Sequence, residues 1–235
     1  NGACTLSAAN KYTGLSTINA GFLREGIANA LSTGGVIVND GGTLDLNGYS
    51  DAIGALTVNS GVTGGTVTTG AGTLTLGGDV TSTGGAANAT ISGNLALGAT
   101  RTLTLTNAAD GMTISAIISG AFGIIKAGAG ILNLSGANTY TGTTTINAGI
   151  LSFNSIQNVS GGASALGSPT TGANGTIALG AAGTLQYVGS GHSSNRVVNL
   201  SASGGTIDAS GGGTLTLSGG VTGNTFGLNL IGTGA

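Results

Sequence analysis

The chain alternates apolar and polar positions in many short runs of about four residues. In residues 131–135, Ile-Leu-Asn-Leu-Ser, the alternation is partial, and Gly-Ala-Asn follows as a break. β-branched and apolar residues fill such runs, whereas turn-forming residues fill the breaks between them. A period of two places alternate side chains on opposite faces of a strand. The pattern therefore predicts short strands, each with a buried apolar face and an outer face of Thr, Asn and Asp.

Strand candidates of this kind recur along the chain at a spacing of roughly 7–11 residues. They are residues 35–38, 43–46, 55–58, 66–68, 73–76, 90–92, 95–97, 102–106, 112–115, 176–179, 184–187, 197–200, 205–208, 214–217 and 228–230. Asn-Gly and Asp-Gly hairpin turns are rare between them, which disfavours a sandwich of paired hairpins. We therefore expect an all-β parallel β-helix (β-solenoid) of roughly ten coils, each with three strands in roughly 20–25 residues.

One motif occurs twice without a gap. Residues 128–152 read GAGILNLSGANTYTGTTTINAGILS, and residues 4–23 read CTLSAANKYTGLSTINAGFL. The shared positions are Asn10, Tyr12, Thr13, Gly14, Asn19 and Gly21 in the first copy, and Asn138, Tyr140, Thr141, Gly142, Asn147 and Gly149 in the second. Both copies predict a strand, a turn, a second strand, a turn at Asn-Ala-Gly and a third strand. We therefore divide the chain into two repeat units, residues 1–127 and 128–235, continuous with each other.

A second pair of matching stretches locates an insertion. Residues 72–76 match residues 213–217 at an offset of 141, whereas the motif repeats at an offset of 128. The second unit therefore carries 13 more residues, which we place at a loop over residues 168–172, around the single proline. We expect residues 24–33 and 156–166 to form a loop or a single helical turn. Residues 232–235 resemble residues 126–129, which suggests a segment cut from a longer chain.

The repeated motif closely resembles the passenger-associated transport repeat of bacterial autotransporter passengers. The resemblance rests on Asn-x-Tyr-Thr-Gly and Ile-Asn-Ala-Gly, which occur at matching distances in both copies, about a fifth of the chain. The first copy departs from the second at Cys4, Ala8, Lys11 and Phe22, which replace Leu132, Gly136, Thr139 and Ile150. The resemblance implies a right-handed parallel β-helix that is exported and displayed on the cell surface. It implies no single activity, because such passengers include adhesins, proteases and esterases.

The composition excludes several classes of protein. Charged residues make up only 5% of the chain and the net charge is −2, against roughly a quarter charged in an ordinary domain. The five basic residues are scattered, so we expect no nucleic-acid partner. Hydrophobic residues make up 40%, which disfavours a disordered chain. No run of 18 apolar residues occurs, so no transmembrane helix is predicted.

Candidate catalytic and metal-binding groups are few. His192 could form a Ser–His–Asp set with Asp208, but no serine lies in a Gly-x-Ser-x-Gly signature, and we interpret His192 as a solvated turn residue. One histidine without a Cys or Glu cluster predicts no zinc site. Asp40, Asp45 and Asp51 could lie on neighbouring coils as in a polysaccharide lyase, but no Lys or Arg accompanies them. We predict no enzyme, metal or cofactor.

Other residue types have structural interpretations. Cys4 aligns with Leu132, so we expect it in the core. The threonine rows are Thr73/Thr75, Thr102/Thr104/Thr106 and Thr214/Thr216. Such rows could order water and bind ice, but outward threonine is also common on any strand. The motif asparagines are expected to satisfy turn backbone groups, and the motif tyrosines to pack at the coil edge and bond through their hydroxyls.

The sequence thus predicts a structural segment of a bacterial surface or extracellular protein that builds a rod or fibre by coil stacking. Its expected partners are further copies of itself, head to tail, or the continuation of the same long chain. Two other functions stay open. An adhesin could bind host or cell-surface glycans through residues 156–172 or a flat Thr/Asn face, and an enzyme could act on polysaccharides.

Overall fold

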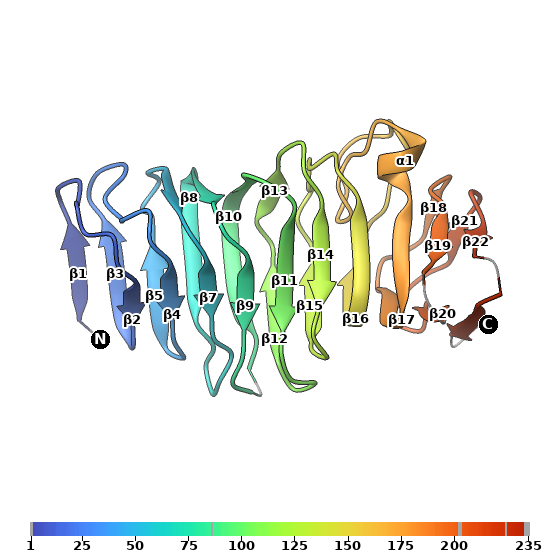
Figure 1. Cartoon of the computed structure of the whole chain (residues 1–235), viewed down its shortest axis with the longest axis horizontal. Coiled ribbons are helices and arrows are strands. Elements are labelled where there is room, and N and C mark those ends of the chain that lie inside the picture. The colour runs from blue at the N-terminus through green and yellow to red at the C-terminus, as the bar shows by residue number, and fades with distance from the viewer. Residues whose placement is uncertain (1, 86, 202–203, 224, 233–235) are drawn as a thin grey trace.

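The computed structural model describes residues 2–85, 87–201, 204–223 and 225–232. The chain winds into a β-solenoid of about ten coils stacked along one long axis (Figure 1). Its strand ladders are all parallel, as between β3 and β5 and between β16 and β17. The predicted all-β solenoid is therefore confirmed, with a single four-residue helix, α1 (Gly172–Gly175), among the described residues.

The strands form three faces. Face A holds β1 (Ala3–Leu6), β3 (Gly21–Glu25), β5 (Gly42–Asp45), β12 (Gly111–Ile114), β15 (Ile131–Leu134), β20 (Gly204–Asp208) and β23 (Gly227–Ile231). Face B holds β2 (Ser16–Ile18), β4 (Val36–Val38), β7 (Leu56–Val58), β9 (Val80–Ser82), β11 (Arg101–Leu105), β14 (Ile124–Ala127), β19 (Val198–Leu200) and β22 (Val221–Thr222). Face C holds β6 (Asp51–Ile53), β13 (Ile117–Ser119), β18 (His192–Ser194) and β21 (Leu215–Leu217).

Four longer strands bend from one face to the next. They are β8 (Thr66–Leu76), β10 (Ala89–Leu97), β16 (Thr144–Phe153) and β17 (Ile177–Tyr187). The first half of β8 pairs with β5 on face A and the second half with β6 on face C. Similarly, β16 pairs first with β14 on face B and then with β15 on face A. These strands turn the corner of a coil without leaving the sheet.

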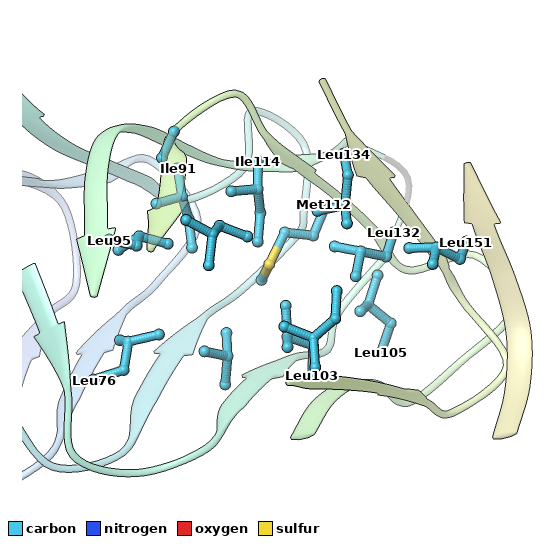
Figure 2. Close-up of a cluster of buried hydrophobic side chains, with 14 of the residues drawn as sticks. Leu76, Ile91, Leu95, Leu103, Leu105, Met112, Ile114, Leu132, Leu134 and Leu151 are labelled. Atoms are coloured by element: carbon cyan, nitrogen blue, oxygen red, sulfur yellow. The ribbon is translucent and has the colours of Figure 1, made fainter. Parts of the chain in front are cut away.

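The core is a set of apolar columns that run along the solenoid axis. On face A, Val67 lies in register between Leu44 and Ile91, and Ile91 pairs onward with Ile114. All of these side chains are buried, and Figure 2 shows side chains from the three faces meeting in one interior. Burying an aliphatic side chain contributes about 1.5–3 kcal/mol. Stacking of apolar residues between coils therefore holds the fold together without a disulfide.

The two motif copies occupy equivalent places in the solenoid. The first copy crosses from β2 to β3 and the second runs along β16, six coils later. The added residues of the second unit lie in residues 154–176, between β16 and β17, and we call this segment the excursion. Strand pairing continues across the boundary at residues 127 and 128, because β14 pairs with β16. The division into two units stays a prediction from the repeat.

Local structure departs from expectation at one turn and agrees with the loop expectation elsewhere. The turn expected at residues 147–149 is a bend inside β16, where the register shifts between Ile146 and Ala148. Arg24 and Glu25 continue β3, and residues 26–33 and 156–166 form loops, one of the two structures expected for these stretches. The short helix α1 lies further along the excursion, where the Thr171 hydroxyl accepts a hydrogen bond from Asn174 N (3.3 Å).

The prediction that Cys4 is a core residue is wrong. Cys4 is an exposed free thiol, whereas its counterpart Leu132 is buried. Leu132 lies between Met112 and Leu151, one coil on each side. Cys4 pairs with Leu23 on one side only, because β1 is the outermost described rung of face A. The closing match to residues 126–129 includes residues 233–235, which lie outside the described residues.

Candidate functional site

The first motif asparagine of each copy, Asn10 or Asn138, joins adjacent coils. Asn138 is buried; its Oδ1 accepts a hydrogen bond from Ile118 N (2.8 Å) on the coil before, and its Nδ2 donates to Ala165 O (2.7 Å) on the coil after. Asn10 makes the second of these contacts in the first copy, donating from Nδ2 to Ala30 O (2.5 Å). This residue therefore links adjacent coils on a side of the solenoid where the ladder is interrupted.

The motif tyrosines make the same local hydrogen bond in both copies. The Tyr140 hydroxyl lies 2.8 Å from Thr144 Oγ1, and the Tyr12 hydroxyl lies 2.6 Å from Ser16 Oγ. Tyr140 is fully buried, and this burial raises its pKa to about 12, whereas Tyr12 is 41% exposed. The next two motif positions bond to the preceding coil in the second copy, Thr141 N to Gly120 O and Gly142 N to Phe122 O. Thr13 and Gly14 are the corresponding residues on the first coil.

The last motif position requires glycine. Gly21 and Gly149 have φ values of +77° and +69°, in the left-handed region that other residues avoid. A Cβ atom on Gly149 would also lie 2.4 Å from Gly128 O. Next to Gly21, Asn19 Oδ1 accepts a hydrogen bond from Asn39 Nδ2, and Asn39 Oδ1 accepts one from Asn59 Nδ2, both at 2.8 Å. This corner carries an asparagine ladder; in the second copy, Asn147 lies at the register shift of β16.

Two buried cations hold backbone carbonyls without a carboxylate partner. Lys126 lies within β14 and its side chain is buried; its Nζ donates to the carbonyl oxygens of Ala127, Gly128 and Ala148 at 2.7–3.1 Å. Burial lowers the pKa of Lys126 to about 8. Arg196 donates from Nε to Gly175 O and from Nη1 to Leu166 O, both at 2.7 Å. Both carbonyls belong to the excursion, so Arg196 anchors it to the solenoid.

The three candidate carboxylates of a lyase are each engaged in structural bonds. Asp40 accepts hydrogen bonds from the backbone of residues 62–64 and from the Thr63 hydroxyl, which lower its pKa to about 2. Asp45 forms an ion pair with Arg24 (2.8 Å). Asp51 is buried beside Glu25, a residue that the sequence interpretation missed because a lone Glu gives no motif. No catalytic pair of the expected kind forms.

The other candidate chemistry does not assemble either. His192 lies in strand β18 rather than in a turn; its Nδ1 is 2.6 Å from the Tyr187 hydroxyl, and the two rings pack edge to face. Asp208, on face A, instead bonds to Gln186 and Ser210. Among the described residues, no three His, Cys, Asp or Glu side chains are placed to hold a metal ion.

Comparison with known proteins agrees with this geometry. The Passenger-associated-transport-repeat family matches residues 1–24 and 124–153, which contain both motif copies. The adhesin BmaC autotransporter of Brucella suis biovar 1 (strain 1330) is 33% identical over 215 residues, which cover 89% of this chain and 5% of that protein. The chain is an autotransporter passenger segment. No solved structure matches it.

The passenger segment spans only a small part of its curated relative's length, 5%. As an autotransporter passenger it belongs to the bacterial cell surface or the exterior. Its described residues contain no helix long and apolar enough to cross a membrane. Its threonine rows face outward beside inward leucines, as Thr73 and Thr75 do beside Leu74. The passenger segment therefore presents a polar surface with few charges around an apolar core.

Proposed function

We propose that this passenger segment is a structural element whose coils extend and stiffen the rod of a longer surface protein. The observation that supports this most is the unbroken parallel pairing on face B, from β2 and β4 through to β19 and β22. The candidate catalytic groups are engaged in structural bonds, which supports a role without catalysis. In electron micrographs of the parent protein, deleting residues 1–235 should shorten the rod by about 50 Å, because coils stack at about 4.8 Å. A rod of unchanged length would contradict the proposal.

A second candidate function is adhesion by the excursion. Its outer residues, such as Gln157, Gly161 and Thr171, are exposed and uncharged, which suits hydrogen bonding to neutral glycans. The relative named above is called an adhesin. A glycan array probed with the segment should show binding that is lost when residues 157–163 are replaced by a Gly-Ser linker. The matched control is the same replacement of residues 61–64, and equal loss in both variants would contradict a role of the excursion.

Head-to-tail association of copies is part of the proposed function. An apolar cavity of about 340 Å³ opens on the last described coil and is lined by Ile207, Leu215, Leu217, Leu228 and Leu230. Leu230 is 70% exposed, and such apolar surface favours burial against a further coil. Sedimentation of the segment at increasing concentration should therefore show association, which Leu230→Glu weakens. A monomer at every concentration would contradict association.

A further inference from the structure

The first motif contains hydrogen-bonding groups that have no partner. In the second copy, Asn138 Oδ1 accepts a hydrogen bond from Ile118 N, and the amides of Thr139 and Tyr140 donate to Ile118 O, all at 2.8–3.1 Å. Ile118 belongs to β13, in the coil before. In the first copy, Asn10 Oδ1 and the backbone amides of residues 11–14 bond to nothing in the described part of the chain. The second copy therefore shows which group the first is suited to hold, an extended backbone on face C.

The opposite end of the solenoid offers a backbone of this kind (Figure 1). On face C, β21 pairs with β18, and His192 N donates to Thr214 O (3.0 Å). Alternate residues of a parallel strand bond to opposite neighbours, so the N–H and C=O groups of Leu215 face away from β18. Among the described strands, β21 pairs with β18 alone. Leu215 therefore presents free backbone groups toward a following coil, as Ile118 does.

The three faces of the two ends match in order and direction. Residues 10–14 lie between β1 and β2, and their counterparts in the second copy lie over face C. If a second copy stacks on the last described coil, β1 meets β23 on face A, residues 10–14 meet β21 on face C, and β2 meets β22 on face B. We propose that the first motif docks on β21 of a second copy, with Asn10 accepting from its backbone and the amides of residues 11–14 donating to it. This inference rests on the head-to-tail association proposed above and assigns its receiving surface.

The apolar side chains of the two ends also correspond. Leu132 belongs to a core column that continues in register to Ile207 and ends at Leu230, which is 70% exposed. Cys4 is the counterpart of Leu132 in the first motif and is also exposed. Docking therefore places Cys4 of one copy on Leu230 of the other. Residues in register on neighbouring strands are about 4.8 Å apart, which is within the range of Cα distances that a disulfide spans.

Charge does not oppose this contact. Residues 209–232 carry no charged side chain, and residues 2–23 carry only Lys11. The two surfaces differ from each other, so each copy can dock on one neighbour and receive another. Such a contact builds open chains of copies rather than closed pairs.

Disulfide cross-linking of a Leu230→Cys variant tests the proposal. Under copper phenanthroline and air, the Cys4 thiol of one copy and the new thiol of the next lose two electrons and two protons to oxygen and form a disulfide. Non-reducing gels should show a ladder of dimers, trimers and longer chains. Because docking raises the effective concentration of the two thiols, the ladder should form more than about tenfold faster than in a control with a distant thiol.

Val62→Cys is that control, because Val62 is 88% exposed and lies in the loop between β7 and β8, away from both ends. Its thiol can meet Cys4 of another copy only by random collision. Equal cross-linking rates in the two variants would overturn the proposal.

Substitutions at the motif test the role of Asn10 in the Leu230→Cys background. Asn10→Ala removes the acceptor and should slow cross-linking by about fivefold or more. Asn10→Asp keeps Oδ1 and loses only the donor to Ala30 O, so it should cross-link at the parent rate. Lys11→Ala is the neighbouring control, since the Lys11 side chain makes no bond in the described structure. Equal slowing by Asn10→Ala and Asn10→Asp would overturn the role of Asn10 as the docking acceptor.

Sedimentation of the unmodified segment separates this docking from the association on which it rests. Association in sedimentation, without faster cross-linking at position 230, would overturn the docking on β21 and leave the association standing. A segment that stays monomeric at every concentration would overturn both.

Discussion

At the scale of single residues, the two motif copies place the same bond in different surroundings. The hydroxyl of Tyr140 bonds to Thr144 with both residues buried, whereas Tyr12 bonds to Ser16 at a partly exposed site. A buried hydroxyl that loses its partner is left unsatisfied, but an exposed one can turn to water. The two copies therefore allow the same hydrogen bond to be compared at a buried site and at an exposed site of one chain.

Tyr140→Phe should lower the free energy of unfolding by about 1–2 kcal/mol, because it leaves the Thr144 hydroxyl buried without a partner. Tyr12→Phe should lower it by less than about 0.5 kcal/mol, as surface changes usually do. Urea unfolding followed by circular dichroism measures both values. Equal losses would mean that burial does not decide the contribution of this bond.

At the scale of elements, the excursion depends on one buried side chain. Arg196, just before β19, reaches two carbonyls of the excursion, Gly175 O and Leu166 O. Burial lowers the pKa of Arg196, and its Nη2 has no hydrogen-bond partner in the described structure. Hydrogen bonds from a charged group contribute about 1.5–3 kcal/mol, which offsets part of the cost of burying the charge.

Arg196→Met should loosen the excursion while the coils stay folded, since it removes both anchoring bonds and keeps the apolar stem. Hydrogen exchange within residues 156–175 should speed up by about tenfold or more, the equivalent of about 1.4 kcal/mol. Arg101→Met is the control, because half-exposed Arg101 makes a comparable bond to Leu76 O (3.0 Å) away from the excursion. Faster exchange across all coils would contradict a local anchor.

At the scale of the whole molecule, charge contributes little to stability. The described residues contain one ion pair, Arg24 with Asp45, and charged residues are 5% of the chain. The coils are held by apolar columns and parallel ladders, which salt does not screen. Exposed ion pairs contribute at most about 1 kcal/mol.

Raising sodium chloride from 0.05 to 0.5 M should therefore shift the melting temperature of the segment by less than about 2 °C. Calorimetry at neutral pH measures this shift. Glu25 and Lys126 lie in the interior, so screening should not reach them. A fall of more than about 5 °C would show that long-range charge interactions contribute to the fold.

The strand pattern, the repeat and the inward leucines could be predicted from the sequence. The two-residue period of a strand and the positions of glycine at turns depend only on residues that are close together in the chain. Leu44, Val67 and Ile91 lie in the core as their alternation predicts. The sequence predicted a turn at Gly149, although β16 bends there without ending. Cys4 could not be placed from its alignment with Leu132, because burial depends on having a coil on both sides.

The sequence by itself determined the solenoid, the two equivalent motif positions and the scarcity of charge. Only the tertiary structure decided which distant groups meet. Leu31 N bonds to Asp51, which lies 20 residues away in the sequence, and Arg196 bonds to Leu166, which lies 30 residues away. Their contacts follow from the register of whole coils and from the path of the excursion. That register is fixed by side-chain packing across faces, which no local pattern of residues contains.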